Sequence, residues 1–364
     1  NSPRRLLSVV GWADRELRGP NDVVTRGNDL LHLTTPQQVR LSMNLKSDDR
    51  LNRRGFIRTA GAAAGIALPA LTDVDRLRAA MAEANSAASA VQEFYASLTD
   101  RQLLTLSFPF GDPRQQRIHA NWNITEPRIG DEFYSDEQRE LINQILRNIT
   151  NEDGYERFTR QMDDDIGGVE EFSVAIFGDP DNGRFQWEMT GRHLTLRADG
   201  AYHDKAAFGG PIVYGHGEAD PSANMYYRHT KQVNEVFKAL DPAQMQQALV
   251  PRAPRETAVR IQGSAGDFTG IRVAAMSSDQ QQLVEETIKY LLSPFRAEDV
   301  GEAMEAMKAG GGFDSLRMSF YEQGDIDDDR LWDMWRIEGP SFVWHFRGSP
   351  HVHAYINIAA AAKA

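Results

Sequence analysis

The chain has 364 residues, 41% of them hydrophobic and 25% charged, with a formal net charge of −12 and no cysteine. This composition is typical of a soluble globular protein with one or two domains, and it excludes collagen, a coiled coil and a disordered chain. Without cysteine there is no disulfide or thiolate, so any metal must be held by histidine, carboxylate or amide side chains. No apolar run reaches the length of a membrane span, and the acidic balance disfavours nucleic acid as a partner.

An arginine pair followed by a weakly apolar stretch predicts an export signal. Arg53 and Arg54 precede Gly-Phe-Ile and a further arginine, and residues 59–71 are small and mildly apolar. This layout is typical of a twin-arginine signal peptide, and Ala82-Glu83-Ala84 offers a cleavage site. We therefore expect the twin-arginine export machinery as a partner and a periplasmic or extracellular location.

The position of this signal suggests how the chain is divided. Met43 stands ten residues before the arginine pair, and residues 1–42 show no sustained hydrophobic period. We predict that residues 1–42 are an over-extended or disordered N-terminus, residues 43–84 the signal peptide, and residues 85–364 a single domain. Residues 1–84 hold 13 Lys and Arg and 9 Asp and Glu, so the exported part carries a net charge of −16.

Helical spacing dominates the first part of this domain, and strand-like alternation begins near residue 171. Helices are expected over 87–106 (with a second one capped by Thr99 or Asp100), 135–146, 154–162, 222–240, 242–249, 277–292 and 297–308. Extended segments are expected over 118–124, 171–177, 185–196, 212–214, 256–262, 316–321, 341–346 and 352–358. Because helices and strands come in blocks, we predict the α+β class, with helices packed around a largely antiparallel sheet in a single compact domain. No internal repeat is apparent in the sequence.

Two histidines near the C-terminus have the spacing of a metal chelate. In a strand, His351 and His353 would point to one face about 7 Å apart, either as metal ligands or as part of a polar sheet face. His345 lies on the preceding strand, and its side depends on the turn. If residue 346 pairs with 351, His345 points away; if 345 pairs with 351, all three histidines converge.

The remaining histidines are less telling. His193 follows a glycine bend at Thr190-Gly191, and alone it is typical of a hydrogen-bonded structural histidine. His216 is expected in a loop that presents it freely, whereas His119 and His229 are expected to be structural. The sequence contains no Walker A loop, dinucleotide fingerprint, nucleophile elbow or H-E-x-x-H motif.

Several phrases, taken in order, resemble the domain-of-unknown-function family 3500, a group of secreted bacterial proteins. They are Phe94-Tyr95-Ala96-Ser97-Leu98, Asn121-Trp122-Asn123-Ile124, Ile176-Phe177-Gly178-Asp179-Pro180, the run Trp187 to Leu196, Arg336-Ile337-Glu338-Gly339-Pro340 and Pro350-His351-Val352-His353. The resemblance implies one composite site of His193, His351 and His353. In this chain, Arg192 replaces the first histidine of the family's G-H-H-L, and Glu338 replaces a histidine of its R-I-H-x-P.

We therefore expect a transition-metal centre, with zinc or copper favoured and iron as a third option. Its ligands would be His193, His351 and His353, with Glu338 and His345 as further ligands. Glu338 or Glu188 would act as general base, and Arg192 would hold an anionic substrate. The function would be that of a metal-dependent hydrolase or oxidoreductase acting on an unknown small molecule. The alternative is a non-catalytic periplasmic protein that binds a metal or ligand, and a third reading makes the histidines a structural core.

Overall fold

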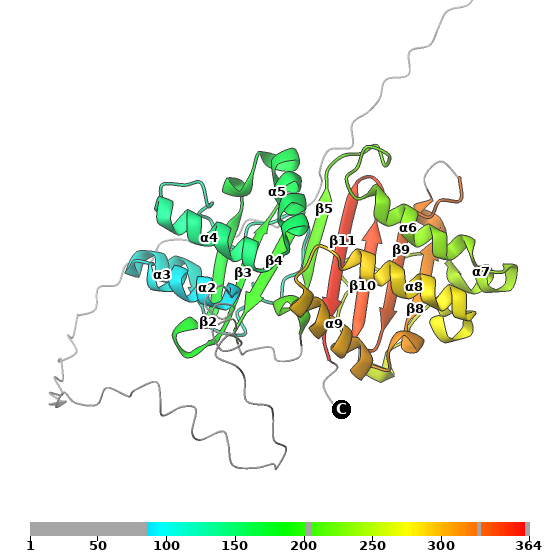
Figure 1. Ribbon diagram of the computed structural model, residues 1–364. Coiled ribbons are helices and arrows are strands. Elements are labelled where there is room, and N and C mark those ends of the chain that lie inside the picture. Colours follow the sequence, from blue (N-terminus) through cyan, green and yellow to red (C-terminus); the bar gives the residue numbers. More distant parts are fainter. Residues whose placement is uncertain (1–85, 201–205, 326–328, 361–364) are drawn as a thin grey trace, which may run out of the picture. The chain divides into compact units, whose positions relative to one another are not determined.

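The computed structural model describes residues 86–200, 206–325 and 329–360, which belong to one compact unit (Figure 1). The predicted N-terminal extension (1–42) and signal peptide (43–84) lie outside the described residues. The eight α-helices of the described part are α2 (Ala87–Ala96), α3 (Asp100–Leu106), α4 (Asp136–Asn148), α5 (Glu152–Ile166), α6 (Tyr227–Lys238), α7 (Pro242–Ala248), α8 (Ser278–Leu291) and α9 (Ala297–Ala309).

The strands form one sheet in the order β1-β2-β3-β4-β5-β11-β10-β9-β8-β6, with β7 paired to β8. Their bounds are β1 (Ser107–Phe108), β2 (Ser173–Asp179), β3 (Arg184–Gly191), β4 (Leu194–Asp199), β5 (Ile212–His216), β6 (Leu249–Val250), β7 (Ile271–Arg272), β8 (Arg317–Tyr321), β9 (Met334–Gly339), β10 (Phe342–Arg347) and β11 (Val352–Ile358). The β1–β2 and β6–β8 pairs are parallel and all other pairs are antiparallel. The predicted α+β class with a largely antiparallel sheet is confirmed.

The two faces of the sheet are covered differently. Figure 1 shows the labelled helices lying over one face, where alternate strand residues such as Trp187, Trp335 and Trp344 form the main core with them. Two segments without long helices or strands cover the other face, and we call residues 109–134 and 251–270 the first and second covering segments. Trp122 packs on Phe177 beneath the first, and Val259 packs on Val343 beneath the second.

The second covering segment accounts for a prediction that was wrong. Residues 256–262 were expected to form a strand, but they do not join the sheet as one, and residues 118–124, expected to be extended, form no strand either. Their backbone groups are instead satisfied by side chains of the strands below, as when Arg336 donates to the Ala258 carbonyl and Asn357 donates to the Val259 carbonyl. A segment lying across a sheet has no neighbouring strand in register, so β-like composition does not make it a strand.

The topology repeats, although no repeat is apparent in the sequence. From one edge the order is β1, β2, β3, β4 and β5, and from the other it is β6, β8, β9, β10 and β11. Each half runs through two helices, a two-residue strand, a covering segment, two further helices and then antiparallel strands. The two halves meet where β5 pairs with β11.

Matching hydrogen bonds in the two halves support this repeat. In the first half, Gln102 and Gln138 occupy the N3 positions of their capping boxes. Their side-chain amides donate to each other at 2.8 and 3.1 Å. In the second half, Gln244 and Gln280 do the same at 3.1 and 2.8 Å. Each pair ties the first helix pair of its half to the second.

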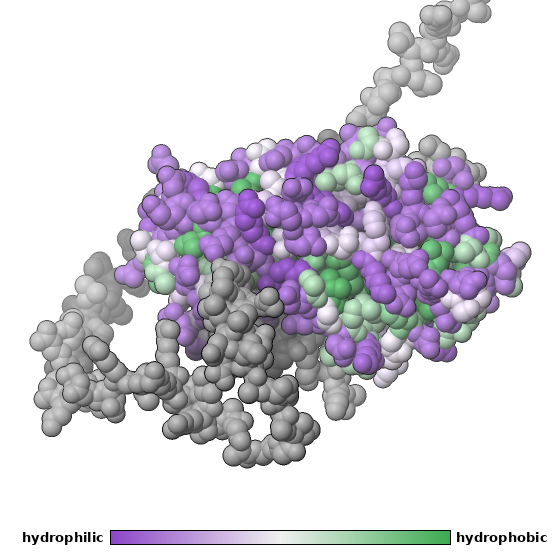
Figure 2. Space-filling model, viewed as in Figure 1, coloured by the Kyte–Doolittle hydropathy of each residue, from purple (hydrophilic) through white to green (hydrophobic). Residues whose placement is uncertain are grey.

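The outer surface of the helical layer is predominantly hydrophilic, with apolar side chains in small scattered groups (Figure 2). Among residues 86–200, 206–325 and 329–360, no helix combines the length and the apolar character needed to cross a membrane.

Candidate metal centre

A tight turn between β3 and β4 positions His193. Gly191 pairs with Leu194, so Arg192 and His193 form a two-residue turn. His193 adopts a left-handed backbone with φ of 56°. Its N–H donates to the Ala120 carbonyl of the first covering segment at 2.6 Å, which fixes the turn against that segment.

The N-terminal end of β11 brings the other two histidines to the same place. His353 lies opposite Gly215 of β5, and His351 stands just before the strand. A Cβ on Gly215 would lie 2.2 Å from the Val352 carbonyl oxygen and 3.3 Å from the His193 Cβ. Glycine at 215 therefore lets His193 approach β11 closely.

The three imidazoles converge through their Nε2 atoms. The His351 Nε2 lies 3.1 Å from the His193 Nε2 and 3.0 Å from the His353 Nε2. The ring centroids are 4.8 to 5.0 Å apart. One zinc ion bound by three nitrogens at about 2.0–2.1 Å holds those nitrogens roughly 3.3 Å apart in a tetrahedral site. We call these three residues the triad. The spacing of their nitrogens is that of a metal site. Among the described residues, the triad is the group of histidine and carboxylate side chains found close enough together to hold a metal ion.

Two carboxylates hold the outer nitrogens of the triad. Asp165, in the last turn of α5, places its Oδ2 2.7 Å from the His193 Nδ1 and accepts from the Gly217 N–H at 2.6 Å. Glu256, in the second covering segment, places its Oε2 3.0 Å from the His353 Nδ1. A carboxylate that accepts from Nδ1–H leaves a lone pair on Nε2, which here faces inward. Carboxylates in this position are usual outer partners of metal-bound histidines.

Burial favours the neutral form of His351 and His353, which is the form that binds metal. Burial, together with the charges of the neighbouring histidines, Arg347 and Arg192, lowers the pKa of His351 to about 4. Burial also lowers the pKa of His353, although its hydrogen bond to Glu256 acts in the opposite direction.

The two carboxylates remain ionised beside the triad. Burial alone would raise the pKa of Asp165, but hydrogen bonds from His193 and Gly217 outweigh it and lower the pKa. For Glu256, the contact with His353 and the charge of Arg347 likewise outweigh burial and lower the pKa. Both groups can therefore accept the Nδ1–H bond at neutral pH.

The structure does not bring Glu338 and His345 to the triad. The pairing of Arg347 with His353 puts His345 opposite Tyr355, two pairs further along the strands, on the same face as His353. There the His345 Nδ1 lies 3.3 Å from the Arg336 Nε, and Glu338 accepts from the same arginine at 3.2 Å. Burial lowers the pKa of His345 to about 3.

Glu188 and Arg192 have different surroundings. Glu188 is fully buried at the middle of β3, accepts from the Arg197 guanidinium at 2.9 Å, and has its pKa raised to about 8 by burial, which Arg197 partly offsets. Arg192 belongs to the same turn as His193. Of the four predicted residues outside the triad, Arg192 is therefore the one placed to act there.

The other histidines of the described residues have different surroundings. His216 ends β5 as a buried residue with its Nε2 3.9 Å from Asp164, so the expected free loop position is wrong. His229 is buried in α6 and its Nδ1 is hydrogen-bonded to the Tyr214 hydroxyl at 2.8 Å, consistent with a structural role. His119 is exposed in the first covering segment, where its Nδ1 accepts from the Asn121 N–H at 3.0 Å.

Sequence reasoning missed Asp165 and Glu256. Asp165 could have been noticed, because Asp163, Asp164 and Asp165 fill the last turn of α5, where negative charge opposes the helix dipole. Glu256 carries no such signal, since it lies in the segment expected to be a strand.

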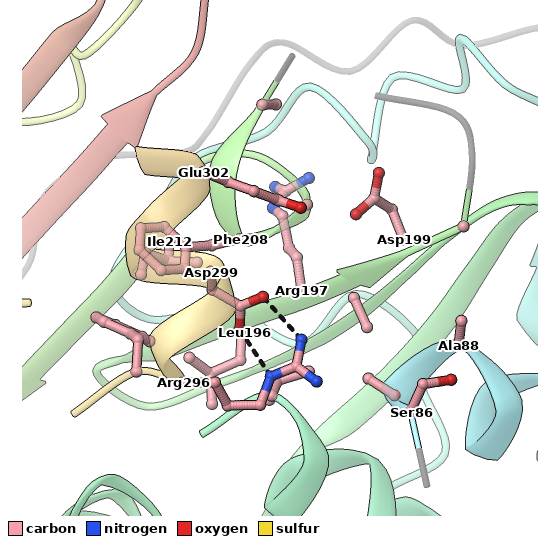
Figure 3. A pocket seen from close by; sticks show the side chains of 17 residues that line it. Ser86, Ala88, Leu196, Arg197, Asp199, Phe208, Ile212, Arg296, Asp299 and Glu302 are labelled. Atoms are coloured by element: carbon pink, nitrogen blue, oxygen red, sulfur yellow. Dashed lines mark hydrogen bonds and ion pairs between the residues drawn. The ribbon is translucent and has the colours of Figure 1, made fainter. Parts of the chain in front are cut away.

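A pocket of about 240 Å³ lies toward the other end of β4 and β5 (Figure 3). β4 and β5 share only the pairs Leu194–Tyr214 and Thr195–Val213, and they diverge beyond them. In Figure 3, Arg296 donates to Asp299 at 2.9 and 2.7 Å, with Glu302 beside the same space. No triad residue lines this pocket.

The comparisons with known proteins identify the family. Residues 80–359 match the family described as "Protein of unknown function (DUF3500)". The chain belongs to that family. No curated protein and no solved structure matches the chain. The triad lies within the matched range, whereas the arginine pair at 53–54 lies before it.

Proposed function

We propose that this DUF3500 protein binds one transition-metal ion through His193, His351 and His353 and acts as a metal-dependent hydrolase. The observation that carries the proposal is the convergence of three Nε2 atoms at 3.0 to 3.1 Å while carboxylates hold the Nδ1 atoms of two of the rings. Three histidine ligands leave a fourth position for water or substrate, as in catalytic rather than structural zinc sites.

The chemistry of such a centre is the activation of water. A divalent zinc ion lowers the pKa of a bound water to about 7, which gives a hydroxide nucleophile at neutral pH. Asp165 and Glu256 would orient the ligands and strengthen their basicity. Copper fits the same three nitrogens and would favour oxidoreductase chemistry, so the metal identity decides the reaction class.

A metal or ligand carrier is the second candidate. His351 and His353 are only partly buried, so an ion held there is accessible to an exchange partner. Export is part of both proposals: the twin-arginine signal predicted at 43–84 would place the protein in the periplasm or outside the cell, with the ion inserted before transport.

The two candidates are separated by activity of the metal-loaded protein. Chelator-stripped protein is reconstituted with one equivalent of zinc or copper and assayed against activated carboxylic and phosphoric esters across pH 5 to 9. A hydrolase gives a rate that rises through a pKa of about 7 and is lost in His351→Ala. Equal rates in the loaded wild-type protein and His351→Ala contradict the hydrolase and leave the carrier.

A further inference from the structure

One arginine in the triad's own turn has no assigned partner. The Arg192 Nε is buried and has no hydrogen-bond partner among the described residues. A Cβ on Gly217 would lie 2.8 Å from the Asp165 Oδ1, 3.1 Å from a terminal nitrogen of Arg192 and 3.4 Å from the Cε1 of His193. The Arg192 guanidinium, the Asp165 carboxylate and the His193 ring therefore lie close together around Gly217.

A second arginine borders the triad from the opposite side. Arg347 pairs with His353 across β10 and β11. Its guanidinium contacts the His353 Nδ1, and its Nε lies 3.3 Å from the Glu256 Oε2. Arg347 thus forms an ion pair with Glu256, although its Nε, like that of Arg192, has no hydrogen-bond partner among the described residues.

The charges of these groups determine what the centre attracts. Asp165 and Glu256 balance the two arginines, and the three histidines bind metal in their neutral form. A divalent ion would therefore add two positive charges to a partly buried space. Such added charge favours an anionic partner, and a planar guanidinium matches the two oxygens of a carboxylate or phosphate group.

We infer that the centre takes an oxyanion, the carboxylate or phosphate group of its substrate, and that Arg192 binds this group next to the metal. The inference rests on the proposed metal centre and adds the substrate class to it. Arg192 would hold one oxygen of the anion while another approaches the open metal position.

The test is anion binding to the cobalt-substituted protein at constant ionic strength, followed by visible absorption during titration with inorganic phosphate and, separately, acetate. We expect both the wild-type protein and Arg192→Gln to hold one equivalent of cobalt. The dissociation constant of the preferred anion should rise roughly tenfold or more in Arg192→Gln, because a charged hydrogen bond is lost, and less in Arg192→Lys.

Arg184→Gln is the matched control, because it removes the same charge from the opposite end of β3. It should bind the anion as the wild-type protein does. Equal anion affinity in the wild-type protein and Arg192→Gln, or no anion binding to the loaded wild-type protein, would overturn the inference while the metal centre stands. Failure of the wild-type protein to take up cobalt, zinc or copper would instead overturn the metal centre, and the inference with it.

Discussion

Asp165 fixes the orientation of the His193 ring of the triad. It accepts from both His193 and the Gly217 N–H, so one carboxylate fixes a metal-binding ring and the end of β5 together. Both its side chain and that of His193 are 3% exposed. Because water has little access to this bond, the carboxylate determines which nitrogen of His193 carries the proton.

We therefore predict that Asp165→Asn weakens metal binding by about 10- to 100-fold, the usual effect of losing an outer partner of a ligand. Competition with a chromophoric chelator measures the affinity. Asp164→Asn, one residue earlier on α5, is the control and should leave the affinity within about twofold. Similar losses in the two variants would indicate a general effect of helix charge.

Buried histidines should also make stability depend on pH. Burial lowers the pKa of His229 to about 3, whereas the unfolded chain has the ordinary value near 6.5. Between these values the unfolded chain binds a proton that the folded chain does not. The contribution of His229 is therefore complete above pH 6.5, is lost as the pH falls toward 3, and amounts to about 1.4 kcal/mol per pH unit within that window.

Urea unfolding between pH 6 and 4.5 measures this slope. We predict that His229→Asn reduces the pH dependence of the unfolding free energy by about one proton, whatever its effect on stability at pH 7. His119→Asn, which removes an exposed histidine, should leave the slope unchanged. A slope in His229→Asn equal to that of the wild-type protein would show that His229 is protonated in the folded protein.

At the scale of the elements, the two glutamine pairs should contribute unequally to the free energy of unfolding. Gln138 is 5% exposed in the first half, whereas its counterpart Gln280 is only partly buried. Removing one partner from a buried hydrogen bond costs about 1–3 kcal/mol, and less where water can replace it. We predict that Gln138→Ala lowers the unfolding free energy by roughly 2 kcal/mol and Gln280→Ala by about 1 kcal/mol. Chemical denaturation of both variants checks this, and the reverse order would contradict it.

Sequence patterns predicted the helices better than the sheet. Ser135 and Thr99 marked the starts of α4 and α3. A capping box involves residues only three apart, so it can be recognised in the sequence. β9 was not predicted, since buried Arg336 and Glu338 interrupt its apolar pattern. Arg336 also bonds to His345 and to the Ala258 carbonyl, which come from other parts of the chain, and local sequence patterns do not reveal such tertiary contacts.

The same distinction applies to the site. The H-x-H spacing pointed to His351 and His353 because both ligands lie within three residues. His193 joined them only through a family resemblance, because its neighbourhood depends on the pairing of β5 with β11. Asp165 and Glu256 come from a helix and a covering segment that the sequence does not place near the histidines.

At the scale of the whole molecule, the repeat lets the turn that carries His193 be compared with its counterpart in the second half. The β9–β10 turn, Gly339 to Phe342, corresponds to the β3–β4 turn, and Ser341 stands where His193 stands. A Cβ on Gly310, at the end of α9, would lie 2.4 Å from the Ser341 Oγ. Ser341 thus occupies in the second half the turn position from which His193 joins the site in the first, and the triad combines His193 of the first half with His351 and His353 of the second. Ser341→Ala is accordingly a control that should keep full metal content.

Export is the second property of the whole chain. If residues 43–84 are a twin-arginine signal, replacing Arg53 and Arg54 with lysine should abolish transport in the producing cell. Immunoblotting of periplasmic and cytoplasmic fractions measures this. Lys46→Arg keeps the charge outside the pair and should leave transport intact. Undiminished export of the double lysine variant would contradict the predicted signal.

The central claim is that the triad holds one metal ion. Elemental mass spectrometry of purified protein, with the double variant His351→Ala/His353→Ala and the controls Ser341→Ala and His345→Gln measured alongside, tests it most directly. We predict about one equivalent of zinc, copper or iron in the wild-type protein and both controls, and none in the double variant. Equal metal content in the wild-type protein and the double variant, or no stoichiometric metal even after reconstitution, would contradict the account.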